Sequence, residues 1–180
     1  FRHCAPRYAD HPSRSDRPSL SFDSLGALNI MRVEESVAAL RITGDDLDPD
    51  EISGLLGGRP SKTHRKGDRG SHIVGPKVHG IATAESGMWT LEAARREPED
   101  MDAQVWEILH GLTSDLGVWR SITARYRVDL FCGLFFSDTY AGLSLSPRSL
   151  AYLGERGIEL ALCIYAGTGD EGRAPNKSLE

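Results

Sequence analysis

The sequence has few cysteines and no long apolar run, and both shortages limit what the protein can be. Its three cysteines are Cys4, Cys132 and Cys163. They lack paired metal-binding spacing and cannot all pair within one chain, which suits a reducing compartment. No apolar run approaches the roughly 20 residues that span a bilayer, and the N-terminus lacks the apolar core of a secretory signal. We therefore expect a cytoplasmic protein that does not bind membranes.

Catalytic signatures are also missing. The chain contains no Gly-x-Ser-x-Gly elbow, no phosphate-binding P-loop and no HExxH motif. The sequence therefore predicts no catalytic residue, no metal site and no cofactor. A formal net charge of −5 and a pI near 5.7 disfavour nucleic acid as a partner.

The composition fits one globular domain. The chain has 180 residues, of which 39% are hydrophobic, enough to bury a core. Residues 1–30 contain prolines and charges without helical or strand periodicity, so we expect a disordered extension or an over-long gene start. Residues 31–166 are predicted to form a single α+β domain, and residues 167–180 a flexible tail.

The stretch from Ser36 to Gly67 is the most informative part of the chain. An apolar run from Val37 to Ile42 predicts a mostly buried strand. Asp48 then provides a helix N-cap, Pro49 fits the first helical position, and Gly57 can adopt the positive φ that ends the helix.

The rest of the chain alternates strands and helices. Strands are predicted at residues 87–91, 128–136 and 158–165, and helices start after 98, near 118 and at Ser146-Pro147. The glycine-rich segment from 59 to 80 is predicted as a loop or a long exposed hairpin. Trp106 and Trp119 have helical spacing and are expected in the core. The result is an α+β fold with one mostly antiparallel sheet of about four strands and helices packed on one face.

Three segments together resemble a known family: LRITGDDLDPDEISGLLGGRPSKTHRKGD, GMWTLE and AGLSLSPRSLAYLGERGIELALCIY. They are similar to a bacterial family catalogued as domain of unknown function number 4279, over roughly residues 36–165. The matching features include the strand before Gly44, the Lys66-Gly67 turn, Trp89 and the Ser146-Pro147 helix start. The resemblance implies a compact α+β fold and no particular activity.

Two groups of side chains were considered as metal ligands. Asp46, Asp48 and Asp50 alternate as in a calcium loop, but Glu51 and Gly57 occupy the positions where that loop requires glycine and glutamate. Helix capping is a better explanation than calcium binding for the acidic residues at these positions. A second group, His64, His72, His79 and Asp68, has no helical ligand spacing, and solvated loop histidines are the simpler interpretation.

The remaining candidate is a basic turn near the strand that contains Trp89. Guanidinium and ammonium groups beside glycine amides can hold a phosphate or a carboxylate. The competing interpretation is a solvated loop whose charges prevent a sheet edge from pairing. The candidate ligand-binding residues are Arg59, Lys62, Arg65, Lys66, Gly67, Arg69 and Trp89.

Three functions remain open at this point. The first is a non-enzymatic protein-binding module, with an immunity-like role as one version, whose acidic surface meets a basic protein partner. The second is a sensor or enzyme for a small anionic ligand that uses the basic turn, residues 59–69. The third is a homo-oligomer formed through an exposed sheet edge.

Overall fold

The computed structural model describes residues 33–73, 79–137 and 141–166, with the backbone alone for 71–73 and 79–82. The predicted terminal segments, 1–30 and 167–180, lie outside these ranges and stay predictions. The elements in chain order are β1 (Glu35–Gly44), α1 (Pro49–Leu56), β2 (Lys62–His64), β3 (Arg69–Ile73), β4 (His79–Thr83), β5 (Gly87–Glu92), α2 (Met101–His110), α3 (Leu116–Thr123), β6 (Arg127–Phe136), α4 (Pro147–Glu155) and β7 (Glu159–Ala166).

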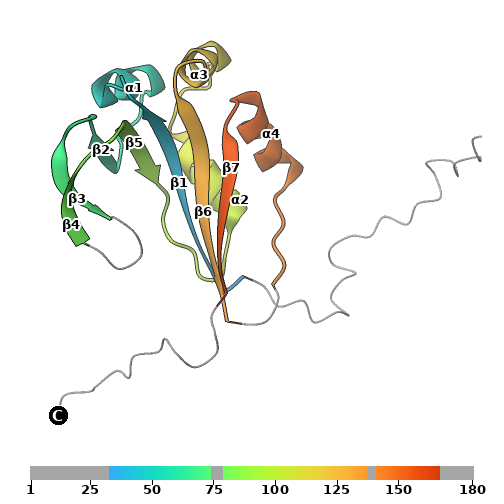
Figure 1. The fold of residues 1–180 in the computed structure, drawn as a ribbon. Helices are drawn as coiled ribbons and strands as arrows, with labels where there is room; N and C mark the ends of the chain where they lie inside the picture. Colours follow the sequence, from blue (N-terminus) through green and yellow to red (C-terminus); the bar gives the residue numbers. More distant parts are fainter. Residues whose placement is uncertain (1–32, 74–78, 138–140, 167–180) are drawn as a thin grey trace, which may run out of the picture. The chain divides into compact units, whose positions relative to one another are not determined.

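A five-stranded sheet organises the described residues (Figure 1). Its strand order is β2-β5-β1-β6-β7, and every neighbouring pair is antiparallel except β6 and β7. The α+β prediction is confirmed. The sheet has one strand more than the four expected, because β2 lies in the segment predicted as a loop. β6 and β7 can run parallel because α4 makes the crossover between them.

The core lies between the sheet and its helices. Along β1, alternate residues are buried, as expected for a strand with helices on one face only; they include Ala38, Leu40 and Ile42. Val105 and Ile108 of α2 belong to the same buried cluster. The helices thus cover one face of the sheet, which agrees with the sequence-based expectation.

Each helix begins at a side chain that accepts a hydrogen bond from a free amide of the first turn. The prediction that Asp48 and Ser146 are N-caps, each followed by proline, is confirmed. Such caps satisfy amides that have no partner within the helix. The four pairs are Asp48 with Asp50, Asp100 with Ala103, Asp115 with Gly117, and Ser146 with Ser149.

A buried polar contact fixes α2 against β1. Ser36 Oγ donates to Gln104 Oε1 at 2.8 Å, and Gln104 Nε2 donates to the carbonyl oxygens of Ser36 at 3.1 Å and Ala94 at 2.8 Å. Ser36 and Gln104 are both fully buried. Because buried polar groups are costly unless they are paired, this network favours a single position of α2.

The segment predicted as a loop or hairpin contains three short strands. β3 and β4 pair with each other in an antiparallel hairpin, from Arg69 opposite Thr83 to Ile73 opposite His79. β2 pairs instead with β5 and extends the main sheet. The hairpin part of the prediction is therefore confirmed, and the loop interpretation of residues 62–64 is wrong.

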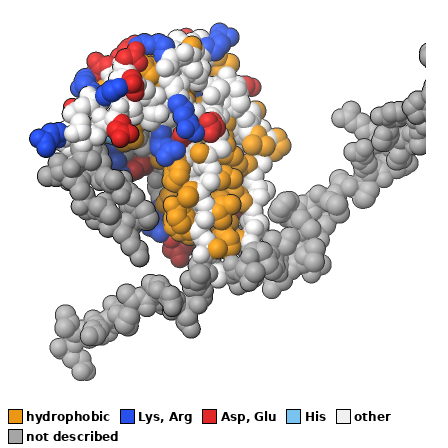
Figure 2. All heavy atoms as spheres, in the orientation of Figure 1, with side chains coloured by type: hydrophobic (Ala, Val, Ile, Leu, Met, Phe, Trp, Pro, Cys, Tyr) orange, Lys and Arg blue, Asp and Glu red, His pale blue; other side chains and the backbone are white. Residues whose placement is uncertain are grey.

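The sheet face opposite the helices carries a patch of hydrophobic side chains over β1, β6 and β7 (Figure 2). Phe135 and Tyr165 stack there with ring centroids 4.7 Å apart. The guanidinium of Arg41 lies 4.5 Å from the ring centroid of Phe131. Cys163 of β7 is half-buried, whereas Cys132 of β6 is fully buried, so the two strand cysteines differ in their exposure to solvent.

Candidate functional site

The basic turn connects β2 to the β3–β4 hairpin. Lys62 lies in β2, Arg65 to Gly67 form the turn, and Arg69 opens β3. Gly67 has a φ of 90°, which a residue with a Cβ rarely adopts, and its amide donates to the carbonyl oxygen of Ala84 at 2.8 Å. The turn is thus built as the sequence suggested, with glycine at its tightest point.

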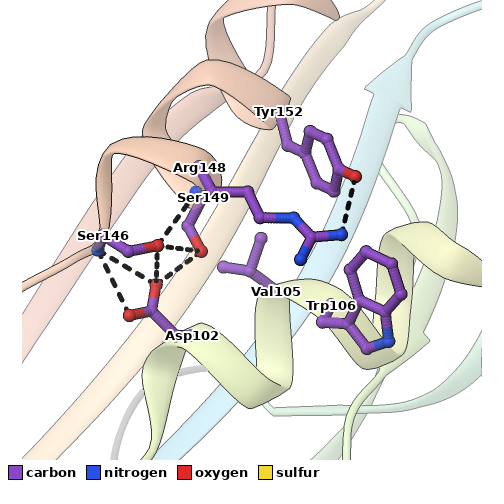
Figure 3. A pocket seen from close by; sticks show the side chains of 7 residues that line it. All are labelled: Asp102, Val105, Trp106, Ser146, Arg148, Ser149 and Tyr152. Carbon is purple, nitrogen blue, oxygen red and sulfur yellow. Dashed lines mark hydrogen bonds between the residues drawn. The ribbon is translucent and has the colours of Figure 1, made fainter.

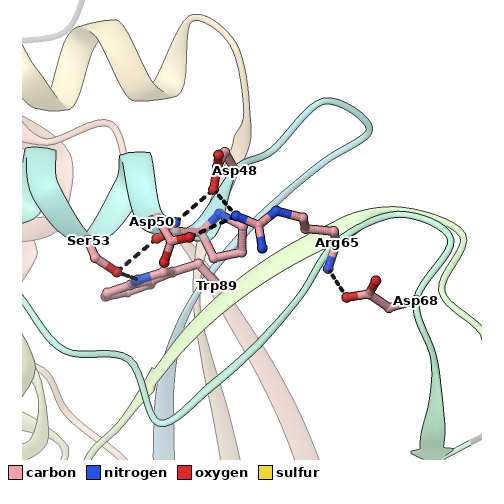
Figure 4. A network of polar contacts seen from close by, with 7 residues as sticks. Asp48, Asp50, Ser53, Arg65, Asp68 and Trp89 are labelled. Atoms are coloured by element: carbon pink, nitrogen blue, oxygen red, sulfur yellow. Dashed lines mark hydrogen bonds and ion pairs between the residues drawn. The ribbon is translucent and has the colours of Figure 1, made fainter.

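Arg65 points away from the turn toward the start of α1 (Figure 4). Its Nη2 lies 2.6 Å from Asp48 Oδ1 and 2.8 Å from Asp50 Oδ2. The amide of Asp50, and after it the guanidinium of Arg65, hold the pKa of the Asp48 carboxyl below its usual 3.8. The hydrogen bonds to Asp50 and Asp48 in turn raise the pKa of Arg65. Arg65 therefore ties the basic turn to the helix N-terminus.

Two further cations of the turn also face carboxylates. Lys66 Nζ lies 2.5 Å from Asp45 Oδ2, and Lys62 Nζ lies 2.6 Å from Glu92 Oε1. Within the part of the chain that the structure describes, Arg59 and Arg69 have no ion pair. An anionic ligand at this turn would have to compete with the four carboxylates that pair with these three cations.

Trp89 is fully buried, and its indole Nε1 donates to Ser53 Oγ of α1 at 3.0 Å (Figure 4). It therefore packs α1 against β5 and offers no surface to a ligand. This corrects the prediction that Trp89 contributes to a binding site with the basic turn. The tryptophan and the cations are close in sequence, but the ring lies on the core face of the sheet.

The acids considered for calcium act as helix-capping and ion-pairing groups instead. Asp48 caps α1, Asp50 pairs with Arg65, and Asp46 lies 3.8 Å from Arg125. Among the described side chains, no group of histidine, cysteine and acidic residues could hold a metal ion. The side chains of His72 and His79 lie outside the described set.

A second candidate site, which sequence analysis missed, is a cleft of about 230 Å³ between α2 and the start of α4 (Figure 3). Its lining combines two hydroxyls, one carboxylate, one guanidinium and two aromatic rings. The lining residues are Asp102, Val105, Trp106, Ser146, Arg148, Ser149 and Tyr152.

Asp102 holds the first turn of α4 at one end of the cleft (Figure 3). Its Oδ1 accepts from Ser146 N at 3.1 Å, Ser146 Oγ at 3.0 Å and Ser149 Oγ at 2.5 Å. A carboxylate is favourable at a helix N-terminus because the free amides there carry partial positive charge. Asp102 is thus a structural group that joins α2 to α4.

The other end of the cleft is aromatic and positively charged. The guanidinium carbon of Arg148 lies 4.3 Å from the ring centroid of Trp106 and 5.4 Å from that of Tyr152. Arg148 Nη2 also lies 3.2 Å from Tyr152 Oη. Trp106 remains 40% exposed. The expectation that both helical tryptophans are core residues is therefore correct for Trp119, which is fully buried, and wrong for Trp106.

Comparison with known proteins places the chain in a family. The family described as "Domain of unknown function (DUF4279)" matches residues 34–167. This chain belongs to the DUF4279 family. The match spans β1 to β7, so the basic turn and the α2–α4 cleft both lie inside it. No curated protein and no solved structure matches the chain significantly.

One sequence signal could have revealed the cleft of this DUF4279 domain. Arg148, Tyr152 and Arg156 are spaced four residues apart, which places them along one side of α4. In α2, Trp106 and His110 have the same spacing and stack with ring centroids 4.7 Å apart. What the sequence does not show is that these two stripes face each other.

The described helices of the DUF4279 domain are those of a globular α+β protein. None of them combines the length and the apolar character that a membrane crossing requires.

Proposed function

We propose that this domain is a non-enzymatic protein-binding module whose contact surface lies on the α2–α4 face. One observation carries the proposal: a tryptophan that is 40% exposed packs against both Arg148 and Tyr152 beside a cleft. Tryptophan, tyrosine and arginine are the residue types enriched where protein partners contribute most binding energy. An exposed indole without such a role leaves apolar area in water.

The chemistry of the cleft supports binding more than catalysis. The hydroxyls of Ser146 and Ser149 donate to Asp102, which thereby joins α2 to the first turn of α4. No histidine, the side chain that most often serves as a general base, is among the seven residues that line the cleft. Asp102, the acceptor of both hydroxyls, already accepts three hydrogen bonds at its Oδ1. Arg148 and the rings can recognise a group, but they supply no nucleophile.

The overall charge suggests the kind of partner. A net charge of −5 favours encounter with a basic protein, and such an encounter weakens as salt screens the charges. An immunity-like role, in which the domain covers the basic site of a nuclease-type partner, is one version of this proposal. A cytoplasmic location is part of this proposal, because three cysteines, an odd number without paired metal-binding spacing, suit a reducing compartment.

The test is affinity capture of the full chain from a lysate of the cells that make it, at low and moderate salt, with mass-spectrometric identification. Trp106→Ala should lose the partner, because it removes the ring from the α2–α4 face. Leu55→Ala is the matched control: Leu55 is 37% exposed but belongs to α1. A stoichiometric partner that both variants retain would refute this surface, and measurable turnover of any substrate would refute the non-enzymatic part.

A small anionic ligand at the basic turn is the alternative proposal. It is favoured by one observation, the two exposed arginines, Arg59 and Arg69, that lack an ion pair among the described residues. It predicts that phosphate or a carboxylate raises the melting temperature and that Lys66→Glu abolishes the effect. Arg120→Glu makes an equal change of charge on α3 and should leave the ligand-induced rise in melting temperature unchanged. Ligand stabilisation that survives Lys66→Glu would exclude the turn as the site.

A homo-oligomer is the third possibility, with β7 as the interface. Ile164 and Tyr165 of this edge strand are 61% and 48% exposed. Edge strands with few charges can pair with a second copy. Light scattering across a concentration series tests it directly: a constant monomer mass would contradict pairing through β7.

A further inference from the structure

Aromatic rings and arginines contact one another where α2, α4 and α3 meet. The distances from guanidinium carbon to ring centroid are 4.3 Å for Arg148 and Trp106, 5.4 Å for Arg148 and Tyr152, and 5.2 Å for Arg156 and Tyr152. The series continues at both ends, with His110 stacked on Trp106 and Arg156 lying 5.9 Å from Trp119. We call the following six residues the cationic–aromatic ladder: His110, Trp106, Arg148, Tyr152, Arg156 and Trp119.

The arginines of the ladder differ from most others in the described part of the chain. Six arginines form ion pairs with carboxylates: Arg41, Arg65, Arg95, Arg96, Arg125 and Arg127. Among the described residues, Arg148 and Arg156 form none. Arg148 donates to the hydroxyl of Tyr152, and Arg156 Nη1 donates to the carbonyl oxygen of Tyr152. Arg156 Nε is buried without a hydrogen-bond partner in that part of the chain.

The position of Arg148 on α4 adds to the local positive potential. It follows Pro147 in the first turn, which contains no acidic residue. The free amides of a helix N-terminus favour negative charge, so a guanidinium there is unfavourable unless an anion lies nearby. The carboxylate of Asp102 provides part of that compensation, but its Oδ1 already accepts from three donors of Ser146 and Ser149.

Stacking leaves the N–H groups of Arg148 available, apart from the one on Nη2 that donates to the Tyr152 hydroxyl. A guanidinium that lies over a ring contacts it with its flat face, while its N–H groups point outward in the plane. In-plane N–H groups match the geometry of a carboxylate, which they can bind through two parallel hydrogen bonds. In the cleft, the Trp106 ring, which is 40% exposed, provides apolar surface beside these donors (Figure 3).

We propose that the ladder binds an acidic side chain of the protein partner, with its carboxylate on Arg148 and its aliphatic stem on the exposed part of the Trp106 ring. This inference rests on the proposed protein-binding function and specifies the chemistry that the cleft recognises. A partner that is basic overall complements the net negative charge of this chain. One glutamate or aspartate on that partner complements the positive charge of Arg148 in the cleft.

The test does not require the partner. The probe is the dipeptide acetyl-Glu-Glu-amide, with acetyl-Gln-Gln-amide as its neutral control, titrated into ¹⁵N-labelled full chain. The reporter is the indole N–H resonance of Trp106, assigned by its loss in Trp106→Phe. The other two indoles donate to Ser53 Oγ and to the carbonyl oxygen of Thr113, at 3.0 and 2.9 Å, and serve as internal references.

We expect a saturable shift of the Trp106 resonance with the glutamate dipeptide alone. Arg148→Gln should weaken binding about tenfold or more, because the hydrogen bonds to a charged group are lost while the side chain keeps its first methylene groups and a polar end. Arg120→Gln, which removes an arginine of α3 that also lacks an ion pair among the described residues, should bind as the wild type does. Equal shifts with the glutamine dipeptide, unchanged binding by Arg148→Gln, or no shift at all would overturn the inference.

These outcomes separate the inference from the proposed function. If Trp106→Ala loses the captured partner while Arg148→Gln retains it, the surface is correct and the carboxylate assignment is wrong. If both variants retain the partner, the surface itself is wrong.

Discussion

The guanidinium of Arg41 donates two hydrogen bonds to the carboxylate of Asp129, at 2.7 Å from Nε and 3.1 Å from Nη2. The two residues are register partners on β1 and β6, on the sheet face opposite the helices. The Asp129 side chain is only 6% exposed, whereas that of Arg41 is 36% exposed. The pair therefore places a nearly buried charge beside the hydrophobic patch of this face. Asp129 has a second cationic partner, Arg127, whose Nε lies 3.8 Å from Asp129 Oδ2.

Asp129→Asn should lower the free energy of unfolding by about 2 kcal/mol, since it removes the charge that Arg41 faces in a partly dehydrated site. Urea denaturation followed by circular dichroism measures this change. Glu159→Gln is the control, because Glu159 also pairs across strands, with Arg127 at 3.0 Å, but its side chain is 57% exposed. Glu159→Gln should lower the free energy of unfolding by about 0.5 kcal/mol or less. Equal losses for the two variants would contradict the role of burial.

Much of this fold could be predicted from local sequence signals. The elements that could not be predicted depend on contacts between residues far apart in the chain. The capping pairs at Asp48 and Ser146 and the apolar run of β1 were predictable because neighbours in sequence create them. β2 was not, since three exposed or half-exposed residues, Lys62–His64, pair with β5 only because the chain returns there. No local pattern distinguishes such a strand from a loop.

The candidate sites show the same limit. Arg65 and Lys66 are visible as a basic turn, but their carboxylate partners become apparent only when the turn folds back on α1. Trp106 has helical spacing, yet it lies beside the buried stripe of α2 that contains Val105 and Ile108. Periodicity predicts that a face is buried; it does not show which ring at the edge of that face stays exposed.

The two cysteines on neighbouring strands should react very differently. Burial raises the pKa of the Cys132 thiol to about 12, so only about one part in ten thousand is thiolate at pH 8. Cys132 is also fully buried, whereas Cys163 is half-buried on the edge strand β7. In a Cys4→Ser background, iodoacetamide should label Cys163 in the native protein and Cys132 only in denaturant. Mass spectrometry of the tryptic peptides identifies the labelled residue, and native labelling of Cys132 at the same rate would contradict its burial.

The cap of α1 should make stability depend on pH in the acidic range. The amide of Asp50 and then Arg65 lower the folded-state pKa of Asp48 below 3.8. The ionised carboxylate therefore adds stability above its unfolded-state pKa, and this contribution is lost as the pH falls through the lowered folded value. Asp48→Asn should be less stable than the wild type near neutral pH, and the difference should vanish well below pH 3.8, as measured by thermal melts across that range.

Arg65→Gln separates the two causes of this pH dependence. It removes the guanidinium but leaves the amide of Asp50, whose hydrogen bond to Asp48 is 2.9 Å long. Part of the pH dependence should therefore remain. A difference between the wild type and Asp48→Asn that is constant from neutral to acidic pH would show that Asp48 is not stabilised in its charged form.

Two glycines of α1 should respond to alanine with opposite signs. Gly54 lies inside the helix and Gly57 caps its C-terminus, with φ 69° and ψ 17° and an amide that donates to the Ser53 carbonyl at 2.9 Å. A Cβ added at either position would meet no atom within 4 Å, so backbone conformation alone decides the outcome. Gly54→Ala should stabilise the domain by about 0.5–1 kcal/mol, because alanine loses less entropy in a helix.

Gly57→Ala should instead destabilise it by about 1 kcal/mol or more, because the left-handed conformation forces a Cβ against the following carbonyl oxygen. Gly57→Asn is the control, since asparagine tolerates this conformation better and should cost less than alanine. Chemical denaturation of the three variants gives the order directly. If Gly57→Ala were as stable as the wild type, α1 would not end at a left-handed residue. The loop that carries the chain from α1 to the basic turn would then leave the helix in a different direction.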